Sequence, residues 1–192
     1  MQHMTREEWL TRLALKLRPT FEQCGVQHIP RFRVSCGLPS GRAFSKGNRI
    51  VGECFSSVCS ADHTNEIFVS PTVSDSLEVG GILIHEMIHA IVGTQEGHKG
   101  RFLRLARAVG LKGKPTATIP GESLVRRLNA LIGELGSYPH APLSLLQIKK
   151  DGTRLIKVAC PACGYTVRAT RKWLEIGSPI CPTDKIDMEA DI

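Results

Sequence analysis

The sequence contains no long hydrophobic run and no recognisable export signal. None of its apolar stretches reaches the roughly 18 residues that a membrane span requires. The first ten residues are polar and charged, and no apolar segment with a cleavage site follows them. We therefore expect a cytoplasmic protein with no membrane partner.

The composition also lacks the bias of disordered or fibrous proteins. Hydrophobic residues make up 42% and charged residues 22% of the 192-residue chain, which is typical of a soluble globular protein. This length allows one main domain and a small appendage, and it is too short for two full enzyme domains.

The number of cysteines is odd, whereas a complete disulfide framework requires an even number. There are seven of them, and in a chain without an export signal this argues against disulfides and favours metal ligation or buried thiols. Four occur in the first third of the chain, where Cys54 and Cys59, with Cys36 and His63 nearby, could form a metal site, although their irregular spacing favours buried thiols. The other three are Cys160, Cys163 and Cys181.

Lysine and arginine are missing from the middle of the chain. Residues 50–98 contain seven acidic residues and no Lys or Arg, whereas residues 1–49 carry a net charge of +6 and residues 99–192 a net charge of +8. An acidic centre between basic flanks suits a cation site whose surroundings face a polyanion. Ordinary solvated charge is the alternative explanation.

The periodicity of apolar residues predicts an α+β fold. Residues 5–24 read as an amphipathic helix. Short β-branched or aromatic runs between turn residues predict a small antiparallel sheet. Asp75 and Glu78 have capping-box spacing before an apolar run to Val92, which predicts a buried central helix. The expected strands are 31–34, 48–52 and 67–70, and the later helices are 101–110 and 122–135. Residues 112–121 are rich in Gly, Pro and Thr, and no helix or strand is predicted there.

A cluster of glycine and proline marks the expected domain boundary. Residues 137–142 contain two prolines directly after a glycine, and proline forbids regular backbone pairing. We expect a main domain at 1–136, a linker at 137–150 and a small module at 151–192.

The expected central helix carries the H-E-x-x-H arrangement. Residues four apart on a helix share a face, so His85 and His89 can bind one tetrahedral cation while Glu86 reaches a metal-bound water. Core histidines that donate to backbone carbonyls are one alternative, but two imidazoles and a glutamate in an apolar helix would be costly without partners. A purely structural metal site is another, and the Glu86 carboxylate favours an open, hydrolytic site over it.

A hydrolytic zinc site needs a third protein ligand. His98 is the first candidate, because it follows the loop 93–97 and precedes a new helix, while Glu96, His63 and His140 remain rivals. Zinc would lower the pKa of its water and polarise a scissile carbonyl, and Glu86 would act as general base and then acid. The expected reaction is peptide hydrolysis.

The segment from His85 to Ala90, with Gly97, His98 and Phe102, resembles the SprT-like zinc metalloproteases, the family of the Spartan DNA–protein crosslink proteases. The resemblance covers residues 76–110 well and 5–111 loosely. It implies a zincin-like domain, His98 as the third zinc ligand, and a protein substrate bound to or crosslinked to DNA.

The late cysteines predict a second, structural zinc site. Cys160-Pro-Ala-Cys163-Gly is a knuckle in which the glycine permits a tight turn behind two thiolates, and strand-like flanks make it half of a zinc ribbon. Cys181 and Asp184 are expected to complete the four ligands, and a ribbon that has lost its metal is the alternative. SprT-like proteins often carry such a ribbon after the protease domain.

Two basic stretches predict contact with nucleic acid. Residues 99–114 contain six basic residues and no acid, and residues 149–172 are also strongly basic. Such patches bind phosphate backbones by counterion release, and Tyr165 or Trp173 could stack on an unpaired base. A solvated face is the alternative, with Trp173 packing the core of the ribbon.

These features together predict a zinc endopeptidase with a ribbon that brings it to DNA. The fold class expected is α+β, with a SprT-type domain of helices and a small antiparallel sheet followed by a zinc-ribbon-like β module. The competing hypotheses are a DNA-binding zinc module whose protease-like site is inactive or regulatory, and a metal-dependent hydrolase of a non-peptide substrate.

Overall fold

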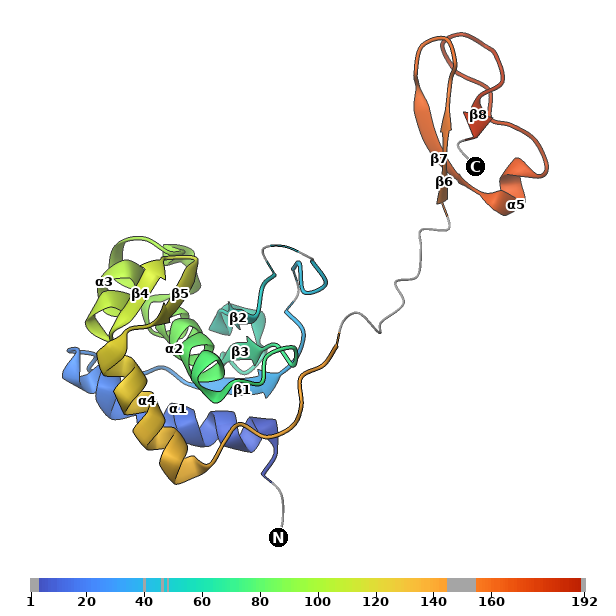
Figure 1. Cartoon of the computed structure of the whole chain (residues 1–192). Coiled ribbons are helices and arrows are strands. Elements are labelled where there is room, and N and C mark those ends of the chain that lie inside the picture. Colours follow the sequence, from blue (N-terminus) through green and yellow to red (C-terminus); the bar gives the residue numbers. More distant parts are fainter. Residues whose placement is uncertain (1–3, 40, 46, 48, 145–154, 191–192) are drawn as a thin grey trace. The chain divides into compact units, whose positions relative to one another are not determined.

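The computed structural model describes residues 4–39, 41–45, 47, 49–144 and 155–190, and it forms two compact units, Met1–Leu145 and Leu146–Ile192 (Figure 1). Helices and small sheets make the chain an α+β protein. None of the helices among the described residues is both long and apolar enough to cross a membrane.

Helix α1 (Arg6–Gln23) opens the first unit. The Thr5 hydroxyl accepts from the Glu8 N–H at 3.1 Å, and the Glu8 carboxylate accepts from the Thr5 N–H at 2.8 Å, which closes a capping box. The predicted amphipathic helix is confirmed, because its apolar face is buried. That face comprises Trp9, Leu10, Leu13, Ala14, Leu17 and Phe21.

The first unit contains a three-stranded mixed sheet in the order β1-β3-β2. Strands β1 (Phe32–Cys36), β2 (Gly52–Phe55) and β3 (Asn65–Val69) correspond to the three expected runs, although β2 shares only Gly52 with its predicted range. The prediction of an antiparallel sheet was wrong for one pairing, since β1 runs parallel to β3 while β2 runs antiparallel to it. Strand patterns report exposure and turns, but they do not specify partners that are distant in sequence.

Helix α2 (Ser76–Val92) is the buried central helix that the sequence predicts. The Asp75 side chain accepts from the Glu78 N–H at 2.8 Å and caps its first turn. The helix contacts α1, α4, strands β2 and β3 of the sheet, and β5, so nearly every face is covered. This enclosure explains why its apolar residues do not form a single stripe.

A hairpin that the sequence did not predict follows helix α3 (Gly100–Ala108). Strands β4 (Leu111–Lys114) and β5 (Ala117–Pro120) pair across a two-residue turn before helix α4 (Glu122–Leu135). Two glycines of α2 let these elements approach closely: a Cβ on Gly80 would lie 3.0 Å from Leu128 of α4, and one on Gly81 would lie 2.9 Å from Pro120 of β5. The hairpin was not predicted because its segment is rich in glycine and proline, which indicate turns more than strands.

Residues 137–144, expected to be linker, lie against the first unit. The Tyr138 ring is 95% buried and meets Trp9 edge to face at 5.1 Å, and the Trp9 indole N–H donates to the Gly136 carbonyl. The Leu143 N–H donates to the Pro71 carbonyl at 2.8 Å. The rest of the expected linker, 145–150, and the start of the expected module, 151–154, lie outside the described residues.

The second unit is a small β module. Strands β6 (Leu155–Ala159) and β7 (Thr166–Thr170) form an antiparallel hairpin, helix α5 (Arg171–Leu174) follows, and β8 (Glu189–Ala190) pairs with β6. Its buried core consists of Val158, Cys160, Cys181 and Met188. Two of these four residues are cysteines, so the apolar core is small for a free-standing unit.

The close approach at Gly81 yields a stability prediction. Gly81→Ala should lower the free energy of unfolding by about 1–3 kcal/mol, because the added methyl group would overlap the Pro120 ring. Gly133→Ala in α4 is the matched control, since a Cβ there meets no atom within 4 Å and alanine favours helix by about 1 kcal/mol. Urea unfolding followed by circular dichroism would measure the free energy of unfolding of both variants. Equal values for Gly81→Ala and Gly133→Ala would show that the packing of the hairpin does not depend on Gly81.

Candidate metal centres

Three imidazoles converge in the first unit. His85 and His89 project from one face of α2, and His98 reaches them from the turn before α3. The Nε2 atom of His98 lies 3.1 Å from Nε2 of His85 and 3.2 Å from Nε2 of His89. Nitrogens bound to one tetrahedral zinc at about 2.0–2.1 Å would stand about 3.3–3.4 Å apart, so both separations are close to those that such an ion requires.

Glycines at the turn after α2 bring His98 back to the helix. Gly93 ends α2 with φ +94°, the short 3-10 helix η2 (Thr94–Glu96) follows, and Gly97 has φ +55°. Both angles are in the region that favours glycine, and they reverse the chain within a few residues. Lys99, by contrast, has φ −120°, a conformation open to any residue, so its side chain puts no strain on the turn.

Phe102 of α3 supports all three histidine rings. It is fully buried and stacks on His89 at 4.4 Å, and it meets His85 and His98 edge to face at 4.9 and 5.0 Å. His89 Nδ1 is buried without a hydrogen-bond partner among the described residues. Packing against Phe102 therefore orients the His89 ring.

Thr118 orients the first histidine. Its Oγ1 lies 2.8 Å from Nδ1 of His85, and β5 carries it to this position. When Nδ1 donates to this hydroxyl, Nε2 is left with a free lone pair facing the other imidazoles. Nothing in the sequence marks Thr118, because its role depends on a hairpin that only the folded chain reveals.

Burial keeps the three imidazoles neutral. Desolvation lowers the pKa of His85 to about 3 and that of His89 to about 4, and neighbouring histidines add to both shifts. Burial also lowers the pKa of His98. All three side chains are therefore unprotonated at neutral pH, which is the form that binds metal ions.

Glu86 is buried next to this cluster, and its side chain is packed against strand β2. A Cβ on Gly52 would lie 2.6 Å from Glu86 Oε1 and 2.6 Å from Ile82, so only glycine leaves room for the carboxylate. Burial, with a smaller contribution from the charge of Glu53, raises the pKa of Glu86 to about 8. In the absence of a nearby cation, Glu86 holds a proton at neutral pH.

The rival ligands proposed from sequence are not part of the cluster. Among the described residues, the histidine group consists of His85, His89 and His98 alone. Glu96 instead accepts a weak hydrogen bond from the Arg101 N–H at 3.4 Å. His63 and His140 are both exposed, have positive φ and lie outside helices and strands.

A second group forms in the C-terminal unit, where the structure brings together all four residues proposed from sequence. Asp184 Oδ2 lies 3.2 Å from the Cys160 sulfur and 3.4 Å from the Cys181 sulfur, and the Cys163 and Cys181 sulfurs are 3.6 Å apart. The sulfur separation is far longer than a disulfide bond and close to that of thiolates sharing one ion. The set of three thiols and one carboxylate could hold a metal ion.

The early cysteines do not form a third group within the described residues. Cys24, Cys36 and Cys54 are half-buried and Cys59 is exposed, so the prediction of buried thiols is met only in part by the first three and is wrong for Cys59. Burial raises the pKa of the Cys54 thiol to about 12, which keeps it protonated and unreactive at neutral pH.

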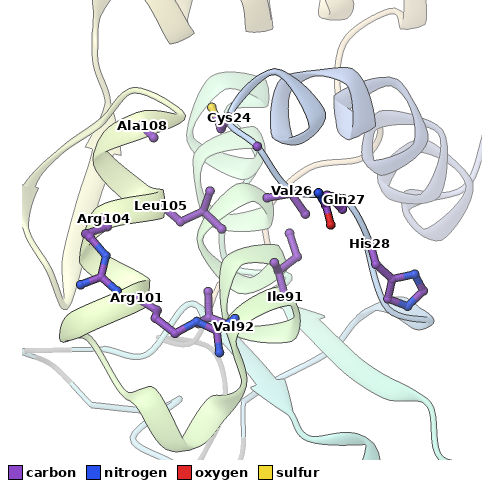
Figure 2. A pocket seen from close by; sticks show the side chains of 11 residues that line it. Cys24, Val26, Gln27, His28, Ile91, Val92, Arg101, Arg104, Leu105 and Ala108 are labelled. Atoms are coloured by element: carbon purple, nitrogen blue, oxygen red, sulfur yellow. The ribbon is translucent and has the colours of Figure 1, made fainter.

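The first basic stretch lines one side of a pocket of about 570 Å³ between α3, the end of α2 and residues 24–28 (Figure 2). Arg101 and Arg104 stand on the α3 side, and Leu105, Ile91 and Val26 provide apolar surface. Neither arginine has an ion-pair partner in the part of the chain that the structure describes. This arrangement can accept an anionic group beside an apolar one.

The second basic stretch is only partly described. Lys149, Lys150 and Arg154 lie outside the described residues. Trp173 is 60% exposed with Lys172 Nζ 5.2 Å from its ring centre, and Tyr165 is 46% exposed. The Trp173 ring is therefore available on the surface, and it does not pack the core of the module.

Comparisons with protein-family models, with curated proteins and with solved structures found no match to this chain.

The contact between Thr118 and His85 predicts a change in metal affinity. Thr118→Val should weaken binding of Zn²⁺ to the histidine group by about 10–100-fold, because the isosteric side chain cannot hold Nδ1. Thr118→Ser keeps the hydroxyl group and should bind Zn²⁺ as the wild type does, and Thr116→Val in the exposed turn of the same hairpin should leave the affinity unchanged. Competition with a chromophoric chelator, in a background with Cys160 and Cys163 replaced by serine, would isolate this site. Unchanged affinity in Thr118→Val would refute the role.

Proposed function

We propose that the chain is a zinc-dependent endopeptidase of the SprT-like kind. The observation that carries the proposal is the convergence of three neutral imidazoles beside the buried carboxyl group of Glu86. Three nitrogen ligands leave one position of a tetrahedral ion open, as hydrolytic zinc sites require. Imidazole ligands also favour zinc over harder cations such as magnesium.

Each residue of the group has a separate task in peptide hydrolysis. A zinc ion held by His85, His89 and His98 would supply Lewis-acid chemistry, lowering the pKa of a water molecule and polarising the scissile carbonyl. Glu86 ionises when a cation is held by the neighbouring imidazoles, because an opposite charge favours the carboxylate. Its carboxylate takes a proton as water oxygen bonds to the carbonyl carbon, and returns it to the nitrogen as the C–N bond breaks.

The position of β2 supports a peptide substrate. It is an outer strand of the sheet, and its first residue, Gly52, lies against Glu86. An extended polypeptide can add to a free strand edge through main-chain hydrogen bonds. A substrate bound along β2 would thus pass close to the proposed base, which favours a protein substrate over a small molecule.

The C-terminal unit fits a structural zinc ribbon. Its ligand group, Cys160, Cys163, Cys181 and Asp184, would fill all four positions of a tetrahedral ion. Cys160 and Cys181 are also half of the buried core, so an ion there would join strands that little apolar surface holds. The ribbon would stabilise this unit and take no part in hydrolysis.

DNA-associated or DNA-crosslinked proteins are the proposed substrates. The unpaired Arg101 and Arg104 beside an apolar surface, and the exposed Trp173 and Tyr165, suit the phosphates and bases of a single strand. Binding to DNA would concentrate the protease on proteins attached to the same strand.

The Glu86→Gln variant tests the proposed reaction. It should retain the zinc content of the wild type and lose about 10²–10⁴-fold in the rate of cleaving a DNA-bound protein, because the amide cannot accept the proton. Glu78→Gln, on the exposed first turn of the same helix, is the matched control. Cleavage would be followed by gel electrophoresis with and without single-stranded DNA. If the wild type proves as inert as Glu86→Gln while DNA binding persists, the chain is a binding module.

Reversing charge at the pocket tests the DNA contact. The double variant Arg101→Glu, Arg104→Glu should bind single-stranded DNA at least about tenfold more weakly, with a shallower salt dependence, because two phosphate contacts are lost. Arg12→Glu, Arg126→Glu is a control of equal net charge at exposed positions of α1 and α4. Fluorescence anisotropy at several salt concentrations would measure both, and equal losses would assign the effect to net charge alone.

A further inference from the structure

Within the described residues, no strand pairs with one row of backbone groups of strand β1. Strand β1 is an outer strand of the sheet, and only every second residue of it bonds to β3. The Asn65 N–H donates to the Arg31 carbonyl, and the Gly37 N–H donates to the Val69 carbonyl, so the odd-numbered residues face β3. The N–H and C=O groups of the even-numbered residues therefore point away from β3. At the end of this row, the Cys36 N–H donates to the Glu7 carboxylate at 3.2 Å.

A groove of about 600 Å³ runs along this open edge, between β1 and helix α1. The helix contributes Thr11, Leu15 and Arg18, which lie on one face because they are four and three residues apart. Leu15 is 57% exposed, although it lies within an otherwise well-covered amphipathic helix. The strand contributes Phe32 to Ser35, so the groove is bordered by strand backbone on one side and by the exposed Leu15 between Thr11 and Arg18 on the other.

The charge of the groove is positive. Its lining includes Arg18, Arg31 and Arg33, and among the residues that the structure describes no acidic one lines it. Arg33 is neutralised by ion pairs with Asp62 and Glu66, whereas Arg18 and Arg31 are exposed and have no ion-pair partner among the described residues. The two unpaired cations favour an acidic occupant.

We propose that this groove binds an extended, acidic segment of a partner protein, which adds to β1 as a further strand. Main-chain hydrogen bonds to Phe32 and Val34 would supply the register, and the side chains would alternate between two faces. Apolar side chains would lie on the α1 side against Leu15. Acidic side chains would lie on the opposite face of the sheet next to Arg31, and Arg18 would pair with an acidic residue at the end of the segment on the α1 side.

The site differs from the proposed substrate edge, because β1 and β2 are the two opposite edges of the same sheet. An occupant of this groove leaves β2 and Glu86 free. The groove is thus a docking surface for a partner, and its test does not depend on whether the chain is a protease.

A designed peptide probes the groove directly. An acetylated and amidated octapeptide of alternating valine and glutamate should bind the full-length protein with a Kd below about 1 mM, as followed by amide chemical shifts. A peptide of alternating valine and lysine should bind at least about tenfold more weakly. The same acidic peptide with N-methyl groups on alternate residues should lose binding, because it keeps the side chains and removes the main-chain donors.

Hydrogen exchange of β1 supplies the decisive measurement. The N–H groups of Phe32 and Val34 should gain protection when the acidic peptide binds, while those of Arg33 and Ser35, which face β3, should be protected already. Leu15→Ala and the double variant Arg18→Ala, Arg31→Ala change only exposed side chains and should each weaken binding.

Three outcomes would overturn the proposal. The first is no binding of the acidic peptide at 1 mM, and the second is equal binding of the N-methylated peptide. The third is dimerisation of the free protein that protects Phe32 and Val34 by itself, which would make a second copy of this chain the occupant. Arg12→Ala and Lys16→Ala, on other faces of α1, are controls that should bind the peptide as the wild type does.

Discussion

The convergence of one buried and two half-buried imidazoles on one point is the constraint on which the placement of the surrounding elements depends. Desolvation holds His85 and His89 neutral, so their nitrogens offer lone pairs and not positive charges. Three neutral rings that face one another can share few protons between them, and a buried polar group without a partner is costly. A cation at their centre would resolve this conflict, and the neighbouring elements keep the three rings facing one point.

Two close approaches to α2 link the fold to the chemistry. On one side, Gly52 lets the Glu86 carboxyl group lie against β2, and on the other, Gly81 lets the hairpin of β4 and β5 dock close enough for Thr118 to reach His85. A methyl group at either position would displace an element that holds a functional side chain. Gly52 of β2 and Gly81 of α2 therefore matter for the candidate site as well as for the packing.

The two units are stabilised in different ways. The first buries a continuous apolar core that includes α1, the sheet and α2, and its histidine group is added to a fold that is already packed. The second has only Val158, Met188 and two of its own candidate ligands at its centre. Metal binding would thus contribute reactivity to the first unit and folding free energy to the second.

Local patterns in the sequence determined the helices α1, α2 and α4, the spacing of His85 and His89, and the four residues grouped in the C-terminal unit, because caps, periodicity and knuckle spacing act over a few residues. His98 was favoured by its position after a glycine turn, but only the folded chain placed its ring beside the others. The parallel pairing of β1, the hairpin carrying Thr118 and the packing of Tyr138 were decided by tertiary structure. These features depend on contacts between residues far apart in the chain, and local sequence patterns do not predict the energies of such contacts.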